Sequence, residues 1–348
     1  MNKNPGHFFY EWLFNWGDLS NGLNFSSPRC NVFWKDLGIL FHTKYMTFAN
    51  VLTLGNQYVN VIIYNVPFFA GQLLLYKTFY GHQPEKKWLF VIVIFLIPSV
   101  AFWCSGIHKD GWVLTAFGFI IYSLDRYLQL KKLKYIITLF LSLFFLFVVR
   151  YFYFVALLPL LFLWIITYKR KYKMVWFFAA FLITAVLFFN IHKLVPQINP
   201  MQLIQSRQSE FLGFIGYSDM KTPKLENNFR SYIRNLPTAV NHVFIQPVFK
   251  ADAPVKYKIT FIDNMVILIF MIAFVLSFKR NNLSNPMYLS LLLYAISMYI
   301  FIGYTIPNCG ALVRYKSEFT VLMLASLAGL SELTQVNDFL NRRLFSSK

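Results

Sequence analysis

The longest apolar run of the chain is LKYIITLFLSLFFLFVVRYFYFVALLPLLFLWIITY, residues 133–168, and it indicates the class of fold. They are apolar almost throughout, and within the run only Arg150 and Pro159 interrupt a helical pattern. An α-helix needs roughly 17–25 apolar residues to cross a lipid bilayer. The stretch is long enough for two crossings, so it is either a tight hairpin of 133–149 and 151–168 or one long, bent helix.

Further apolar runs of this length lie at 58–79, 88–104, 111–130, 173–191, 261–279, 286–305 and 311–331. With the two runs above they predict an all-α, polytopic transmembrane helical bundle of about nine spans. The composition agrees, because 14% of the residues are charged whereas a soluble domain carries about 25%. A water-exposed globule is therefore excluded.

The net charge of +19 could indicate nucleic-acid binding, but the basic residues fall in short clusters between the apolar runs. One alternating set of short connections holds sixteen Lys and Arg, and the opposite set holds four. Basic residues concentrate on the cytoplasmic side of membrane proteins. We therefore expect no nucleic-acid partner and a multi-pass protein of the bacterial inner (cytoplasmic) membrane, with the sixteen-residue set facing the cytoplasm.

This orientation divides the chain into five parts. The amino-terminal segment 1–57 is non-cytoplasmic and shows no signal peptide, so either it is translocated unaided or, as we favour, it is the first outer loop of a longer chain with an upstream helix. The other parts are six transmembrane helices in 58–191, a long outer loop at 192–260, three transmembrane helices in 261–331 and a cytoplasmic tail at 332–348.

A short outer turn between two predicted spans concentrates polar residues. It reads PSVAFWCSGIHKD, residues 98–110, and ends in His108, Lys109 and Asp110. An imidazole, an ammonium and a carboxylate in so short a turn favour a functional site, since charge beside hydrocarbon is costly. The simpler alternative is that Asp110 caps the next helix while His108 and Lys109 are solvated.

Two other outer turns carry cations. Arg150 begins one of them, and Arg314, Tyr315 and Lys316 open the last predicted span. Cations at a helix amino terminus oppose the helix dipole, so an anion is expected to occupy that position. The phosphate of a lipid carrier suits them, because arginine grips phosphate with two hydrogen bonds. For Arg150, snorkelling to the interface is an equally weighted alternative.

A transferase that uses such a carrier needs a carboxylate to deprotonate the acceptor hydroxyl. The outer candidates are Asp18, Asp36 and Asp110, and for each of them a solvated surface role is the simpler interpretation. Cys30, Cys104 and Cys309 lack metal-binding spacing, so no metal site is predicted, although a divalent metal as cofactor stays open. All three lie on the predicted outer side, where a disulfide is permitted but unpaired cysteines are the simpler alternative.

The many spans, the charged outer loops, the long late outer loop and the Arg-Tyr element before the last span resemble the GT-C glycosyltransferases. Residues 98–110 are also similar to a turn of bacterial membrane proteins of polysaccharide assembly. The resemblance implies a sugar donor linked to polyprenyl phosphate and a catalytic Asp in the first outer loop, which makes Asp18 or Asp36 the counterpart.

These observations favour a membrane glycosyltransferase that moves a sugar from a polyprenyl-phosphate carrier to a cell-envelope glycan or lipid acceptor. An O-antigen-type polysaccharide polymerase is the alternative enzyme. A transporter or flippase subunit is the alternative from another class, but the chain shows neither inverted repeats nor ionisable residues in mid-span. A non-catalytic membrane scaffold is a further alternative.

Overall fold

The computed structural model describes residues 28–170, 173–194, 199–213, 218–249, 252–279 and 285–334, together with Leu283 and Asp338. These ranges contain helices and two isolated β-bridges but no β-strand, which confirms the all-α prediction. In chain order the elements are α3 (Pro28–Thr53), α4 (Gln57–His82), η1 (Pro84–Lys86), α5 (Lys87–Phe95), α6 (Pro98–Trp103), α7 (Lys109–Leu130), α8 (Leu133–Thr167), α9 (Lys173–Leu194), α10 (Pro200–Leu212), α11 (Phe229–Val240), η2 (Asn241–Ile245), α12 (Val255–Leu276), α13 (Pro286–Thr305) and α14 (Cys309–Leu330).

Several described helices have the length and composition of membrane spans. Five qualify, namely α4, α8, Val175–Lys193 within α9, α12 and α13. Their outward faces carry large apolar side chains such as Phe140 and Phe144 of α8 and Leu182 of α9. Exposed apolar surface of this extent is unfavourable in water and suits a lipid environment. The helices therefore indicate a membrane protein.

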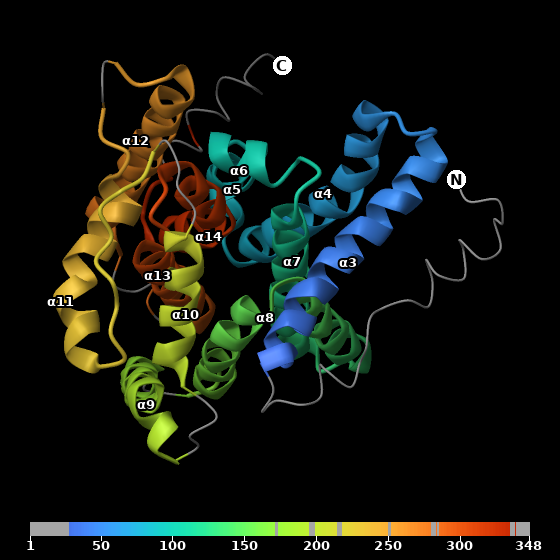
Figure 1. Cartoon of the computed structure of the whole chain (residues 1–348). Coiled ribbons are helices and arrows are strands. Elements are labelled where there is room, and N and C mark those ends of the chain that lie inside the picture. The colour runs from blue at the N-terminus through green and yellow to red at the C-terminus, as the bar shows by residue number, and fades with distance from the viewer. Residues whose placement is uncertain are drawn as a thin grey trace.

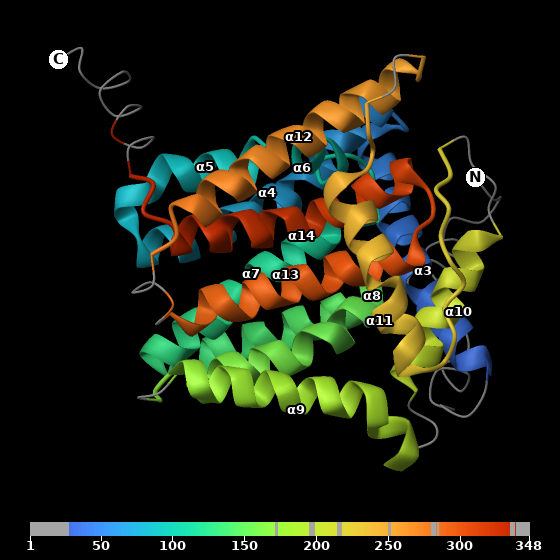
Figure 2. The ribbon, with the colours of Figure 1, turned by 90° about the vertical axis from the view of Figure 1, so that its left-hand side faces the viewer.

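The long helices run side by side, and Figure 2 views this bundle from the side. Helices α3, α10 and α11 gather at one end of the bundle, which Figure 1 shows facing the viewer. The α6–α7 turn and the start of α14 lie at the same end. We call it the Asp110 end, after a residue in the first turn of α7, and the opposite end the Asp125 end.

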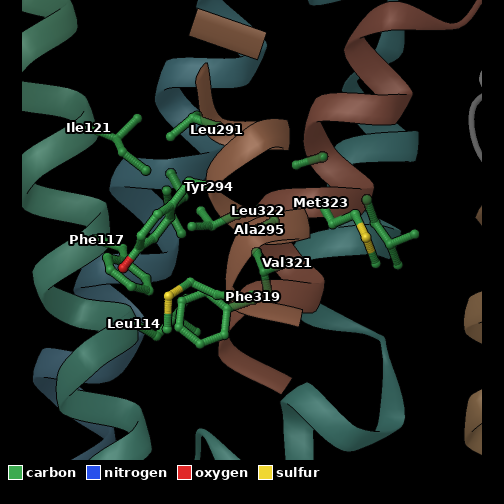
Figure 3. Close-up of a cluster of buried hydrophobic side chains, with 14 of the residues drawn as sticks. Leu114, Phe117, Ile121, Leu291, Tyr294, Ala295, Phe319, Val321, Leu322 and Met323 are labelled. Atoms are coloured by element: carbon green, nitrogen blue, oxygen red, sulfur yellow. The ribbon is translucent and has the colours of Figure 1, made fainter. Parts of the chain in front are cut away.

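Helices α7 and α14 form the centre of the bundle. Nearly every residue of α7 from Asp110 to Ile121 is buried, and so is every residue of α14 from Lys316 to Leu330. Figure 3 shows how Phe117 of α7, Tyr294 of α13 and Phe319 of α14 meet in this core. Because other helices surround them, α7 and α14 can carry polar residues that a lipid-facing helix could not.

Helix α7 packs against α4 through two facing glycines. A Cβ atom on Gly118 would lie 2.1 Å from the carbonyl oxygen of Gly71, and one on Gly71 would lie 2.4 Å from the Cα of Thr115. Only glycine allows the two backbones to come this close. The contact fixes α7, and with it the residues of its first turn, relative to α4.

Helix α8 is formed by the longest apolar run, and it folds back on itself at Arg150. The backbone of Arg150 is not helical, with φ −152° and ψ 79°. On the amino-terminal side, Tyr135 packs against Tyr122 of α7, and on the carboxyl-terminal side Tyr168 lies within electrostatic range of Asp125 of α7. Both arms of α8 thus reach the Asp125 end while Arg150 lies at the tip between them, which favours the hairpin over one continuous helix.

The segments assigned to outer regions contain helices that hydrophobic periodicity did not indicate. Helix α3 occupies much of 1–57, and α10, α11 and the π-helix η2 lie within 192–260. Helix α3 approaches the tip of α8 so closely that a Cβ on Gly38 would lie 2.8 Å from the carbonyl oxygen of Val149. The run 88–104 is also divided, because α5 ends at Phe95 and Pro98 begins α6.

At the Asp125 end, a buried lysine holds the end of α14. The Lys86 ammonium donates hydrogen bonds to the carbonyl oxygens of Ala328, Gly329 and Ser331, at 3.0, 3.3 and 2.6 Å. The last carbonyls of a helix have no partner within the helix, and a cation there also complements the helix dipole. Lys86 therefore satisfies the carboxyl terminus of the central helix.

We predict that Gly118→Ala lowers the free energy of unfolding by about 2 kcal/mol, because the added methyl must separate two backbones. Thermal unfolding of the purified protein in detergent measures the change. Gly213→Ala is the matched control, since the atom nearest to its added Cβ lies 3.5 Å away. Equal stability of the two variants would contradict the close α4–α7 contact.

Candidate functional site

The turn before α7 places an acidic residue in the first turn of that helix. His108 precedes the helix as its amino-terminal cap residue, without a capping hydrogen bond from its side chain, and Asp110 follows two positions later. The positive end of the helix dipole stabilises a carboxylate there. Gly111 keeps the turn tight against α4, since a Cβ at this position would lie 2.3 Å from the ring of Phe68.

Asp110 joins two arginines from distant parts of the sequence. Its Oδ1 accepts a hydrogen bond from an Nη atom of Arg150 at 3.2 Å, and its Oδ2 accepts one from Nε of Arg314 at 2.6 Å. The Asp110 side chain is fully buried, whereas those of Arg150 and Arg314 keep 17% and 31% of their exposure. The three predicted turns therefore meet at one place, with the carboxylate inside and the guanidinium groups nearer the surface.

Aromatic rings support both guanidinium groups. The Arg150 guanidinium lies 5.0 Å from the ring centre of Tyr315 and 5.7 Å from that of Tyr153, and that of Arg314 lies 5.6 Å from Trp103. Rings at such distances attract cations and hold their planes in place. Tyr315 was predicted as a binding residue, and it lies directly beside Arg150.

Lys109 and His108 extend this positive region. Burial and the neighbouring Arg150 lower the pKa of Lys109 to about 8, and burial and Arg314 lower the pKa of His108. Burial also lowers the pKa of His42 in α3 to about 4, and Lys109 adds to this shift. Burial is the main cause of all three shifts, and the neighbouring cations add to it.

The structure places the predicted carboxylates in different settings. Asp36 of α3 is exposed and lies within electrostatic range of Lys109, so the helix brings it to the rim of this region. Asp110 has an arginine on each oxygen and is fully buried, which makes it an anchor for cations rather than an accessible base. Asp18 lies outside the described residues.

Lys316 does not join the other predicted cations. It lies on another face of α14 and is 1% exposed, and its ammonium donates to the carbonyl oxygen of Val243 at 3.1 Å and to Oδ1 of Asn264 at 2.5 Å. Residues two apart on a helix point in nearly opposite directions, which is why Arg314 and Lys316 separate. Lys316 instead connects α14 to η2 and α12.

A buried carboxyl that the sequence reasoning missed lies beside Asp110. Glu318 of α14 is fully buried and lies within electrostatic range of Asp110, Arg150 and Arg314. We call Asp110, Arg150, Arg314 and Glu318 the Asp110 cluster. The available signal was an acidic residue four positions after Arg314, on the same face of an otherwise apolar helix.

A small recess lies beside the cluster between α8, α10, α13 and α14, and its cavity volume of about 30 Å³ has room for about one water molecule. Arg207 of α10 lines it together with Arg150, and the Arg207 guanidinium lies 4.7 Å from the ring centre of Phe211. Arg207 also pairs with the exposed Glu210 at 2.6 Å. The full lining is Arg150, Phe152, Tyr153, Arg207, Phe211, Phe301, Ile302, Thr305, Ile306 and Tyr315.

No group of three metal-binding side chains comes together within the described residues. Cys104 and Cys309 are both buried and are not joined by a disulfide. The arrangement is instead suited to anions, because guanidinium groups and an ammonium lie near the surface and aromatic rings limit their movement.

We predict that Asp110→Asn lowers the free energy of unfolding by about 2 kcal/mol or more, because it leaves two partly buried arginines without their counter-charge. Chemical unfolding in detergent measures the loss. Asp252→Asn, at an exposed position, should leave stability unchanged. Adding Arg314→Gln to Asp110→Asn should recover part of the loss, and a double variant less stable than Asp110→Asn would contradict the pairing.

The lowered pKa of Lys109 predicts that acetylation by acetic anhydride reaches half its maximal rate near pH 8, because only the neutral amine reacts. Mass spectrometry of the peptide gives the rate, normalised to the exposed Lys224. Arg150→Gln removes a neighbouring cation and should move the midpoint to higher pH. A wild-type midpoint above pH 10 would show that the amine is not in this environment.

Comparison with known proteins adds no relative for the site. No protein-family model, no curated protein and no solved structure matches the chain. A function can therefore be proposed only from the chemistry of the residues at the Asp110 end.

Proposed function

We propose that the chain is a membrane glycosyltransferase that takes its sugar from a polyprenyl-phosphate carrier and acts on a cell-envelope glycan or lipid acceptor. The observation that carries the proposal is the meeting of Arg150, Arg314 and Lys109 at one end of an apolar bundle. A carrier of this class has an anionic head and a hydrocarbon tail. The cations can bind the anionic head, and the lipid-facing helices beside them can contact the hydrocarbon tail.

The proposed topology has about nine spans: α4, α5 with α6, α7, the two arms of α8, α9, α12, α13 and α14. Each arm of α8 has about 17 residues and so reaches about 26 Å, close to the hydrocarbon thickness of a bilayer. The excess of basic residues in the connections at the Asp125 end supports the proposal that this end faces the cytoplasm, in a bacterial inner membrane. The Asp110 end is then the outer face.

The donor phosphate binds to Arg150, Arg314 and Lys109, with Arg207 as a further cation beside Arg150. During transfer the acceptor hydroxyl oxygen bonds to the anomeric carbon, and the bond from that carbon to the phosphate oxygen breaks. The phosphate leaves with the electron pair. Positive groups already in place stabilise the charge that develops on it.

Asp36 is the proposed base that takes the proton of the acceptor hydroxyl. It is an exposed carboxylate, and it lies at the rim of the cation region near Lys109. A general base needs a free lone pair and access to the acceptor. Asp110 lacks that access, and it serves to hold the two arginines.

A polysaccharide polymerase of the O-antigen type is the second candidate. The burial of Asp110 between two arginines favours it, because dependence on arginines, without a carboxylate base, would point to a polymerase rather than a transferase. The two enzymes differ in their donors. A transferase takes a single sugar from the carrier, whereas a polymerase takes an oligosaccharide unit.

The test measures binding of polyprenyl phosphate to the protein in lipid nanodiscs, with the matched polyprenol as the uncharged control. We expect Arg150→Gln and Arg314→Gln each to weaken phosphate binding about tenfold or more, since each removes a charge-assisted contact. Arg234→Gln, at an exposed position on α11, is the matched control. Equal binding of phosphate and polyprenol would contradict the proposal.

The catalytic step is tested with Asp36→Asn. This variant should retain phosphate binding and lose glycan formation in membranes supplied with lipid-linked donors. Products extended by one sugar support the transferase, and products extended by whole oligosaccharide units support the polymerase. Full activity of Asp36→Asn would remove Asp36 from the reaction.

A further inference from the structure

Glu318 is the buried group that the proposed reaction does not use. It lies one helical turn after Arg314 on α14, and its side chain is fully buried. Within the described residues no N–H or O–H group donates to either of its carboxyl oxygens. Its hydrogen-bonding neighbour is the Asp110 carboxyl, and two carboxyls can share a hydrogen bond only when one of them carries a proton. A buried carboxyl in such a position calls for a physical reason.

The surroundings of Glu318 contain few groups that can carry charge. The ions within range are Asp110 of α7, Arg150 of α8 and Arg314 of its own helix. The other titratable neighbours are side chains that are neutral near pH 7, namely Tyr153 of α8, Tyr294 of α13 and Cys104, which follows α6. The protonation state of Glu318 therefore decides the net charge of the Asp110 cluster.

The net charge of the Asp110 cluster follows from the number of its ionised groups. With Glu318 protonated, two arginines face one carboxylate, and the cluster carries one net positive charge. With Glu318 ionised, two arginines face two carboxylates, and the net charge is zero. A fully buried carboxylate that receives no hydrogen bond from an N–H or O–H group is costly, so a proton is the counter-charge that Glu318 can take up in place.

We propose that Glu318 is a proton-binding site, and that an anion binds to Arg150 and Arg314 together with a proton on Glu318. An anion arriving at the arginines repels an ionised Glu318, and the carboxyl relieves that repulsion when it takes up a proton. A protonated Glu318 can also donate a hydrogen bond to Asp110 while the arginines turn toward the anion. The inference rests on the proposed function only in taking the anion to be a phosphate.

Coupling of this kind is reciprocal: if a proton on Glu318 strengthens anion binding, bound anion strengthens proton binding equally. An ionised carboxylate about 8–10 Å from an anion weakens its binding on the order of tenfold at the effective dielectric constant of a protein. Anion affinity should therefore fall about tenfold as the pH rises through the titration of Glu318.

The experiment uses methyl farnesyl phosphate, a phosphodiester with one constant charge, because a phosphate monoester itself titrates near pH 6. Calorimetry of its binding to the full chain in nanodiscs, between pH 5.5 and 9 and in buffers of different ionisation enthalpy, gives both the affinity and the protons taken up. The background carries His108→Gln and Lys109→Gln, so that these neighbours do not contribute. We compare it with and without Glu318→Gln.

The background with Glu318 intact should take up a fraction of a proton when the phosphodiester binds. Its affinity should fall about tenfold from pH 5.5 to pH 9. Glu318→Gln should bind tightly at every pH and take up none. Glu332→Gln, which removes an exposed carboxylate paired with Lys279, should behave like the background. Proton uptake that persists in Glu318→Gln, or that is absent from the background, overturns the inference. Folded wild-type protein, which keeps Lys109, contradicts the proposed function as well if it binds no phosphodiester at any pH.

Discussion

The pairing of one buried carboxylate with two arginines sets the arrangement of the Asp110 end. Asp110, Arg150 and Arg314 come from α7, the tip of α8 and α14, and no pair of them is close in sequence. A carboxylate without counter-charges would be too costly at a fully buried position. Each arginine in turn needs the charge of this carboxylate, because an unpaired cation beside apolar helices is costly. The three side chains therefore fix how the three helices meet, and the recess beside Arg150 follows from that arrangement.

The long helices could be predicted from the sequence because hydrophobic length is a local signal. The predicted runs 111–130, 286–305 and 311–331 differ from α7, α13 and α14 by no more than two residues at either end. The choice between a hairpin and a bent helix at Arg150 could not be made locally. It depends on contacts of both arms with α7, through Tyr122 and Asp125.

Other features of the structure could not be predicted from the sequence, and in each case the reason is physical. Helix α3 has no continuous apolar run, and its place is set by the close approach of Gly38 to the tip of α8. Lys316 looked equivalent to Arg314, but the helical turn between them sends it to Val243 and Asn264. The expectation that no ionisable residue lies within a span was wrong for Glu318, which is fully buried inside the last predicted span, one turn beyond the polar residues at its end. The convergence of Asp110, Arg150 and Arg314 was anticipated only as a shared face, not as direct contacts.

The lysine bound to the end of α14 has a mechanical consequence. Arg314 ties the first turns of this helix to α7, and Lys86 ties its last carbonyls to the connection between α4 and α5. A helix attached at both ends cannot slide along its axis without breaking one attachment. Any rearrangement at the Asp110 end must therefore come from rotation of side chains or from movement of α3 and α10, while α14 keeps its position along its own axis.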